Sequence, residues 1–351
     1  MRRRIGPMVE TLTPGYFALV MASGIVSLGL SLTGYDTLSI ILFAIGIGAY
    51  VILCALNLWR FIGYRHAMLD DFRATRRAFG FFTFVAGTNV LGARAGAQLW
   101  YDVTLWLLVV AGAAWLVLGY VVPWSAVLGQ QERPVVAAAN GTWFIWVVAS
   151  QSVAIVSASL EVVFDGARQP LSVLAIVSWS VGVFLYAASA IFVSLRLMLY
   201  PLQPEDLDPP YWVCMGALAI TVVAGARIVE MDSAPMVDAT RGLIAGLSVV
   251  FWGFATWLIP VLVAAGWWRH VRHRIPLRYE ATLWSIIFPL GMYAVAGIYL
   301  GRADRLPLVE AIGTRWLWLA VAAWAIVFVA MLRHVGLAVF GRVGGAADRV
   351  G

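Results

Sequence analysis

The feature that most constrains this chain is a series of long apolar stretches that recurs from one end to the other, separated by short polar segments. A bilayer core about 30 Å thick requires about 20 mostly apolar residues in each spanning helix. We therefore expect an all-α integral membrane protein that forms a single transmembrane domain over residues 1–351. Ten stretches reach the required length, at residues 13–34, 37–60, 78–99, 103–128, 137–160, 171–197, 211–230, 241–268, 280–300 and 312–332.

The low charge content supports a lipid-exposed fold. Asp, Glu, Lys and Arg make up 12% of the 351 residues and 62% are apolar, whereas soluble domains have about 25% charged residues. The 24 basic residues are all arginines and give a pI near 9.6, but they lie in short segments between the apolar stretches. Positive charge in such segments sets membrane topology, so we expect no nucleic-acid partner.

The arginines also predict the orientation, because cytoplasmic loops carry the excess of positive charge. With the N-terminus in the cytoplasm, 17 of the 24 lie inside: Arg2, Arg3, Arg4, Arg60, Arg65, Arg73, Arg76, Arg77, Arg133, Arg196, Arg269, Arg272, Arg274, Arg278, Arg333, Arg342 and Arg349. The other seven lie toward the far side: Arg94, Arg168, Arg227, Arg241, Arg302, Arg305 and Arg315. Residues 1–12 and 334–351 are thus predicted to be cytoplasmic segments of a multi-pass protein of the cell membrane.

The spacing of the stretches predicts an internal repeat. The odd-numbered stretches begin near residues 13, 78, 138, 211 and 280, at intervals of 60 to 73 residues. A unit of two helices therefore recurs five times, and five parallel helical hairpins describe the chain most simply.

The two classes of helix differ in chemistry. Odd stretches carry small and polar residues at mid-depth, whereas the fourth, eighth and tenth stretches hold ten tryptophans, rings suited to lipid contact. We expect the even helices to form an outer ring and the odd helices to surround a lumen. The alternative is that the small residues only mediate helix packing. Candidate lining residues are Ser23, Ser27, Thr88, Asn89, Ser150, Ser152 and Thr221.

Charge near the far ends of the odd helices predicts a preference for anions. Arg94 and Arg227 lie near the outer ends of two odd stretches, and Arg302 lies just beyond a third. Together they would make an electropositive vestibule that concentrates anions. Each arginine taken alone is equally consistent with snorkelling to the membrane interface.

The ninth stretch contains Phe288 next to Pro289. Proline inside a helix frees a backbone carbonyl group and bends the axis. An aromatic side chain beside such a bend, in a helix assigned to the lumen, is a candidate gate, because it can close a dewetted pore.

Several classes of protein are disfavoured. The histidines lie in loops or tails and offer no haem ligand inside the membrane, and the two cysteines lie within apolar stretches, which supports neither a disulfide nor a zinc site. Acidic residues sit at the ends of the stretches, so no titratable group is expected at mid-depth and proton coupling is disfavoured. We expect no cofactor, no metal and no catalytic residues. The groups concerned are His66, His270, His273, His334, Cys54, Cys214, Asp102, Glu230, Glu280 and Glu310.

Two segments carry a resemblance to a known family. Thr13 to Ala18 with Met21 to Val26 in the first stretch, and Trp284 to Gly291 in the ninth, resemble the tellurite-resistance/dicarboxylate transporter family. This family includes bacterial TehA, fungal malate and sulfite permeases and plant slow anion channels, and the resemblance covers essentially the whole chain. It implies ten helices in five hairpins about a pseudo-fivefold axis, a central pore lined by the odd helices, and a homotrimer.

The resemblance also implies roles for single residues. Phe288 matches the gating phenylalanine of the family and Pro289 the adjacent kink proline. The channels carry further mid-depth prolines where this chain has glycine, and glycine also permits a bend. The expected bend positions besides Pro289 are Gly87, Gly216, Gly225 and Gly291.

The expected function is passage of small anions through a central pore, as an anion channel or uniporter. The alternative is a coupled carrier of C4-dicarboxylates such as malate, or an exporter of tellurite or sulfite. A membrane enzyme would need a reactive cluster at membrane depth, which the sequence does not show, and a structural role without transport would need no polar lining.

Overall fold

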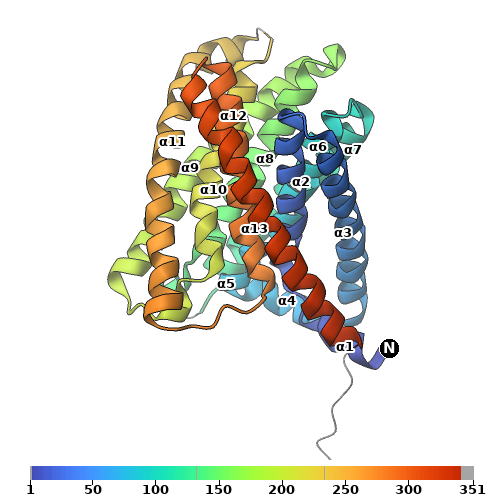
Figure 1. The fold of residues 1–351 in the computed structure, drawn as a ribbon, viewed down its shortest axis with the longest axis vertical. Helices are drawn as coiled ribbons and strands as arrows, with labels where there is room; N and C mark the ends of the chain where they lie inside the picture. The colour runs from blue at the N-terminus through green and yellow to red at the C-terminus, as the bar shows by residue number, and fades with distance from the viewer. Residues whose placement is uncertain (1, 132, 233, 341–351) are drawn as a thin grey trace, which may run out of the picture.

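The computed structural model describes residues 2–131, 133–232 and 234–340, and in this part of the chain all regular elements are helical. Figure 1 shows the long helices running roughly parallel along the longest axis of the molecule. Short helices at the lower end are α1 (Arg2–Glu10), α4 (Arg65–Arg73) and α5 (Thr75–Ala78). The long helices are α2 (Ala18–Leu32), α3 (Asp36–Gly63), α6 (Phe82–Gly96), α7 (Tyr101–Pro123), α8 (Phe144–Glu161), α9 (Arg168–Leu199), α10 (Val213–Val229), α11 (Pro235–Trp267), α12 (Trp284–Ala303) and α13 (Pro307–Phe340).

Nine helical stretches in the described residues are long and apolar enough to cross a membrane. They coincide with nine of the ten predicted stretches. The third predicted stretch, 78–99, corresponds to α5, a 3-10 turn and α6, and α6 itself has only 15 residues, among them Asn89 and Arg94. This stretch is therefore not among the nine because its mean hydropathy is lowered by polar residues, and not because its helix is broken.

The long helices fall into two groups that differ in burial. In α2, α8, α10 and α12, between 78% and 89% of the most apolar window is buried, against 17% to 39% in α3, α7, α9, α11 and α13. In α6, 12 of the 15 residues are buried as well. We call α2, α6, α8, α10 and α12 the inner helices and the other five the outer helices.

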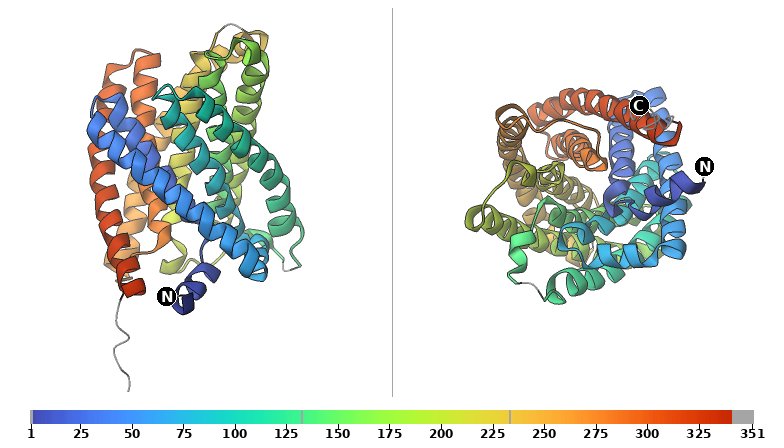
Figure 2. Two further views of the ribbon diagram at one scale, coloured as in Figure 1. Left: turned by 90° about the vertical axis from the view of Figure 1, so that its right-hand side faces the viewer. Right: turned by 90° about the horizontal axis from the view of Figure 1, so that it is seen from below.

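The inner helices form a closed series of contacts. Each packs against the next along the chain, α2 on α6, α6 on α8, α8 on α10 and α10 on α12, and α12 returns to contact α2. Each inner helix also packs against the outer helix that follows it. Figure 2 shows the result from below, with α12 inside the rim that α11 and α13 form.

Close approach between inner helices depends on small residues. A Cβ atom added to Gly216 of α10 would lie 2.8 Å from Cγ of Pro289 in α12, and one added to Gly291 would lie 2.8 Å from Cγ2 of Ile25 in α2. These distances are below van der Waals contact, so glycine is needed for the observed helix separation. The glycines thus stabilise the inner group by letting neighbouring backbones meet.

Every inner helix starts in the same way, with a 3-10 turn that leads directly into the α-helix. All five starts lie at one end of the molecule, the lower end in Figure 1. Amide groups at helix starts carry a partial positive charge, so this end collects five such charges. The turns are η1 (Pro14–Phe17), η2 (Phe79–Phe81), η5 (Gly141–Trp143), η8 (Pro209–Trp212) and η10 (Ala281–Leu283).

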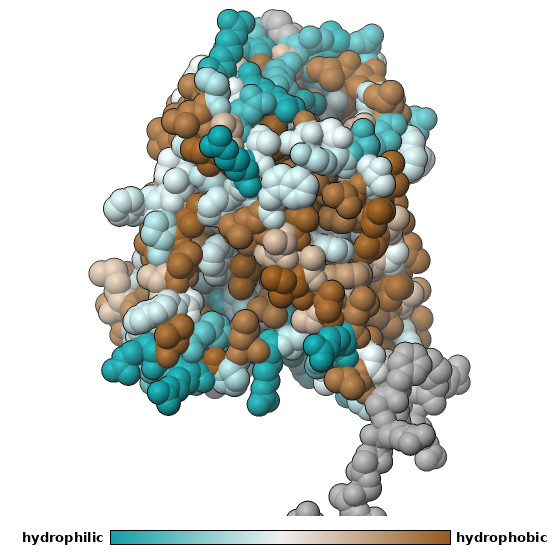
Figure 3. All heavy atoms as spheres, viewed as in Figure 1, coloured by the Kyte–Doolittle hydropathy of each residue, from teal (hydrophilic) through white to brown (hydrophobic). Residues whose placement is uncertain are grey.

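The surface agrees with a membrane position. On the face shown in Figure 3, hydrophobic side chains gather at mid-height and hydrophilic ones at the upper and lower ends. The two terminal segments are partly helical: part of 1–12 forms α1, and α13 continues to Phe340. The rest of the predicted tail, residues 341–351, lies outside the described residues.

Candidate functional site

Two cavities lie at opposite ends of the inner helices. The first, of about 320 Å³, is lined by every one of the five helix starts, and we call it the helix-start pocket. One lining residue from each 3-10 turn is Gly15, Gly80, Thr142, Pro210 and Thr282. Five helix starts around one cavity favour an anion there, because the partial charges of their N–H groups add.

Two arginines add full positive charge to the helix-start pocket. Arg76 and Arg77 in α5 both line it. Nη2 of Arg76 lies 3.0 Å from Oδ1 of Asp206, and Nη1 of Arg77 lies 3.0 Å from Oδ1 of Asp71. The carboxylates that hold them do not line the pocket, so they fix the arginines from behind. About half of each arginine side chain remains exposed.

The second cavity, of about 180 Å³, lies toward the other ends of the same five helices, and we call it the helix-end pocket. Each inner helix contributes lining residues, among them Leu28, Ala93, Ile155, Val223 and Met292. Most of this lining is apolar. The two pockets therefore differ in character, although one is lined by the 3-10 turns that lead into the five helices and the other by the five helices themselves.

Arg227 is the basic group in the helix-end pocket. Its Nη1 lies 2.6 Å from Oε2 of Glu230, its Nε donates to Oγ of Ser159 at 3.3 Å, and its guanidinium group lies 5.7 Å from the ring centre of Tyr299. The side chain is 26% exposed. Arg227 lies two residues before the end of α10.

Phe288 lies between the two pockets on one face of α12. Ser285 lines the helix-start pocket, whereas Met292 and Tyr299 line the helix-end pocket. Phe288 follows Ser285 by three positions and precedes Met292 by four, which places all three on the same helical face. Phe288 is 1% exposed and is not among the lining residues of either pocket.

A polar pair joins the neighbouring helices α6 and α8. Nδ2 of Asn89 donates to Oγ of Ser152 at 3.0 Å, and both side chains are buried. Asn89 precedes the lining residue Ala93 by four positions and Ser152 precedes Ile155 by three, so both side chains follow the pocket-lining faces. Oδ1 of Asn89 has no hydrogen-bond partner within the described residues.

The other predicted lining residues form hydrogen bonds with outer helices or with the backbone and are not among the lining residues of either pocket. Oγ of Ser23 accepts from Nε1 of Trp324 at 3.0 Å, and Oγ of Ser150 accepts from Nε1 of Trp115 at 2.9 Å. Thr88 bonds the hydroxyl group of Tyr50 in α3 at 3.0 Å. The remaining two are Ser27, which donates to the backbone oxygen of Ser39 in α3, and Thr221, which donates to the backbone oxygen of Ala217.

Arg94 is fully buried where α2, α3 and α6 meet and does not line either pocket. Its Nε donates to Oγ of Ser27 at 2.9 Å and its Nη2 to Oγ of Ser39 at 2.8 Å. The amide oxygen of Gln98, oriented by these partners, accepts from both terminal nitrogens, and the ring of Phe43 lies 5.1 Å away. Neutral groups thus hold this cation.

Arg302 lies outside both pockets. Its Nε lies 2.8 Å from Oε1 of Glu310, and its Nη2 donates to the backbone oxygen of Leu32 at 3.0 Å. Of the three arginines predicted to attract anions, only Arg227 therefore lines a cavity formed by the inner helices.

The predicted bend positions lie at helix contacts. Gly216 meets Pro289, and Gly87 and Gly291 face α2. Gly225 faces Ile244 and Ser248 of the outer helix α11. Each lies inside an uninterrupted α-helix.

Sequence reasoning missed the polar groups just before the inner helices. Arg76, Arg77 and Asp208 line the helix-start pocket, but all three precede the apolar stretches and look like ordinary loop residues. Their position in the repeat could have identified them, since each lies just before an odd-numbered stretch. The buried carboxyl group of Glu161, 3.5 Å from Nε of Arg168, was also missed.

No cluster of three or more His, Cys, Asp or Glu side chains suited to a metal ion occurs among the described residues. Cys54 and Cys214 are free thiols on different helices. The polar side chains of the two pockets carry hydroxyl, amide and guanidinium groups, and one carboxyl group, that of Asp208, lines the helix-start pocket. Such groups can bind and release an ion.

Comparison with known proteins places the chain among transport proteins. It is 24% identical over 335 residues to an uncharacterized transporter of Methanocaldococcus jannaschii, a match that covers 92% of this chain and 93% of the relative. It is 61% identical over 168 residues to an uncharacterized membrane protein of Mycobacterium tuberculosis, which covers 48% of this chain and 85% of the relative. The profile of the voltage-dependent anion channel family (SLAC1) matches residues 11–332. The resemblance found in the sequence is thereby confirmed, and the chain belongs to the voltage-dependent anion channel family.

Proposed function

We propose that the chain conducts small anions along the axis of the inner helices, from the helix-start pocket to the helix-end pocket. The observation that carries this proposal is that the 3-10 turns leading into all five inner helices line the helix-start pocket, and all five of these helices line the helix-end pocket. Two cavities at opposite ends of the same five helices are the expected ends of one path. Family membership supports anion transport across a membrane, and the resemblance implies a pseudo-fivefold arrangement of five hairpins around such a path.

Charge at the two ends supports anions as the substrate. Arg76 and Arg77 line one pocket and Arg227 lines the other, and the five helix starts add partial positive charge at the first. Between the pockets, the inner faces offer the Asn89–Ser152 pair and apolar side chains. We propose that selection depends on the cost of dehydrating the anion and on the charge at both ends, rather than on a tight site in the middle.

We propose that Phe288 is the gate of this path. Its ring is buried on the face of α12 that joins the two pockets. A bulky apolar ring at the narrowest level excludes water and ions until it moves. Gly216 and Pro289 meet next to it, so a change in the α10–α12 contact would shift the gate directly.

The positive-inside rule assigns the helix-start end to the cytoplasm, because most arginines lie in the segments at that end. Both termini of the chain would then be cytoplasmic in the cell membrane. As the family resemblance implies, we propose three copies per assembly, each with its own path.

Chemical modification at the two ends tests the path. In a protein with Cys54→Ala and Cys214→Ala, Ser285→Cys and Met292→Cys each place one thiol in one of the two pockets. A negatively charged methanethiosulfonate reagent should react at both positions and reduce chloride flux in liposomes by more than about half, because it adds bulk and like charge to the path.

Two exposed positions outside the pockets serve as controls: Gln203→Cys near the helix-start end and Gln169→Cys near the helix-end side. Both should react without changing the flux. If Ser285→Cys and Met292→Cys become fully modified and the flux is unchanged, the two pockets are not parts of the conduction path.

A further inference from the structure

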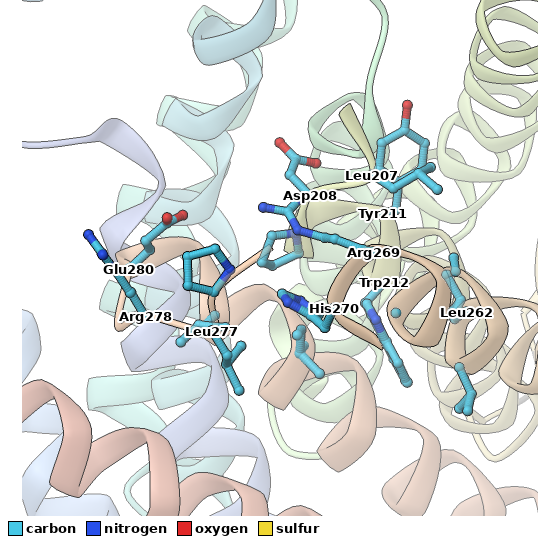
Figure 4. Close-up of a pocket in the computed structure, with 17 residues that line it drawn as sticks. Leu207, Asp208, Tyr211, Trp212, Leu262, Arg269, His270, Leu277, Arg278 and Glu280 are labelled. Carbon is cyan, nitrogen blue, oxygen red and sulfur yellow. The ribbon is translucent and has the colours of Figure 1, made fainter. Parts of the chain in front are cut away.

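Asp208 is an acidic side chain in a region that otherwise favours anions. It lies in the segment before η8 and lines the helix-start pocket. It also lines an adjoining side pocket of about 320 Å³ between η8, the end of α11 and residues 276–280. Figure 4 shows its carboxyl group on the same side of this side pocket as the guanidinium group of Arg269. Asp208 thus stands between the proposed path and a second cavity.

The carboxyl group of Asp208 is poorly satisfied. Its Oδ1 is buried and has no hydrogen-bond partner within the described residues, and its side chain does not cap the helical turn that follows. None of the ion pairs within 4 Å in the described residues includes Asp208. A carboxylate with one buried oxygen that lacks such partners is costly, so the neutral form is favoured.

Asp206, only two residues earlier, shows the opposite arrangement. Its two oxygens lie 3.0 Å from Nη2 of Arg76 and 3.0 Å from Nη2 of Arg196, and Oδ2 also accepts the backbone N–H of Gln203 at 3.1 Å. Burial opposes its ionisation, but this hydrogen bond and the two arginines outweigh burial and hold the pKa of Asp206 below its usual value. Asp206 is therefore ionised near neutral pH.

At Asp208 the balance is reversed. Burial raises the pKa of Asp208 to about 7, although the positive charges of Arg269 and Arg76 act to lower it and the negative charge of Asp206 acts to raise it. The carboxyl group is neutral below this pH and ionised above it. The other charged or titratable groups that line the helix-start pocket or the side pocket are Arg77, Tyr211, His270, Arg278 and Glu280.

We propose that Asp208 is a proton-binding site of the helix-start pocket, and that binding of a proton increases the passage of anions. This proposal rests on the proposed function. Two arginines and one carboxyl group line the pocket, so their summed charge is +1 with Asp208 ionised and +2 with Asp208 protonated. The added positive charge raises the local concentration of anions. Acid on the helix-start side would thus increase the flux at a fixed anion gradient.

The test uses chloride, whose own charge is constant in the working range, in liposomes of purified full-length protein between pH 6 and pH 8. The wild-type flux should rise about fivefold from the high to the low pH, with a midpoint near 7. Asp208→Asn should be fast at every pH, because it resembles the protonated form. The matched control Asp206→Asn should keep a pH dependence, with its midpoint moved to lower pH because the negative charge of Asp206 no longer raises the pKa of Asp208.

An independent measurement needs no transport. Infrared difference spectra between the two pH limits should show a carboxyl band for the wild type that is absent in Asp208→Asn and present in Asp208→Glu. If Asp208→Asn keeps the wild-type pH dependence, or if the band persists in it, the proton site is wrong. If the wild type carries no chloride at any pH while the band titrates, the proposed function fails and the proton site stands.

Discussion

Arg94 and Arg227 lie on inner helices and were predicted from the sequence to serve the same vestibule, but the structure puts them in different surroundings. Arg94 is fully buried where α2, α3 and α6 meet and is held by Ser27, Ser39 and Gln98. Arg227 lines the helix-end pocket and is paired with Glu230. Both arginines lie near the C-terminal ends of their helices. The direction in which each side chain leaves the helix axis therefore decides which role it can have.

The difference suggests separate effects on stability and transport. A guanidinium group inside the helix junction holds three helices together through charge-assisted hydrogen bonds. One that faces a cavity acts on ions that enter the cavity. Mutation of Arg94 should therefore lower the stability of the protein, whereas mutation of Arg227 should change the anion flux. The following experiments test this difference.

The largest effect is expected for Arg94→Met. It removes every hydrogen bond to Ser27, Ser39 and Gln98 from the guanidinium group, and the buried hydroxyl groups lose their donor. We expect a loss of about 3 kcal/mol in the free energy of unfolding, seen as a lower thermal midpoint in detergent. Arg94→Lys should lower the free energy of unfolding by less than Arg94→Met does, since one ammonium group can reach some of the acceptors but not all of them. An unchanged midpoint for Arg94→Met would show that the junction does not depend on the arginine.

A smaller effect, on transport rather than stability, is expected for Arg227→Gln. Removal of the positive charge from the helix-end pocket should lower chloride flux about threefold at low ionic strength, and less in high salt, where charges are screened. Glu230→Gln should raise the chloride flux, because it removes the carboxylate that pairs with Arg227. Equal shifts in the same direction for both mutants would contradict an electrostatic role.

The smallest effect is expected for Arg302→Gln. The side chain is 45% exposed, pairs with an exposed Glu310 and lines neither pocket. Surface ion pairs of this kind contribute about 0.5 kcal/mol or less, so both the thermal midpoint and the chloride flux should match the wild type within error. A flux loss as large as that of Arg227→Gln would extend the anion-attracting region beyond the helix-end pocket.

The same comparison explains what could be predicted from the sequence. The long apolar stretches predicted the positions of the helices, and the contrast between small and bulky residues predicted which helices are buried, as α8 and α11 illustrate. Hydrophobicity and spacing carry this information because burial and helix length depend on them directly.

The direction of individual side chains could not be predicted in this way. An inner helix is apolar on nearly all sides and buried all round, so its sequence has no polar face that marks the lumen. Ser23 and Ser150 therefore looked like lining residues, although they accept hydrogen bonds from Trp324 and Trp115 of outer helices. Those tryptophans were expected to face lipid. Their buried N–H groups required an acceptor, and the serines supply it.

The central claim is that anions pass along the inner helices and that the ring of Phe288 limits their passage. The most direct test compares chloride flux through purified wild-type protein, Phe288→Ala and the control Phe144→Ala in liposomes. Phe144 is equally buried but packs against Tyr186 of α9, with 5.3 Å between the ring centres, so its loss creates a similar void outside the proposed path.

We predict that Phe288→Ala raises the flux on the order of tenfold, which corresponds to lowering the barrier by about 1.4 kcal/mol. Phe144→Ala should leave the flux at the wild-type level. Flux through a folded Phe288→Ala protein that equals the wild-type and Phe144→Ala values would contradict the account.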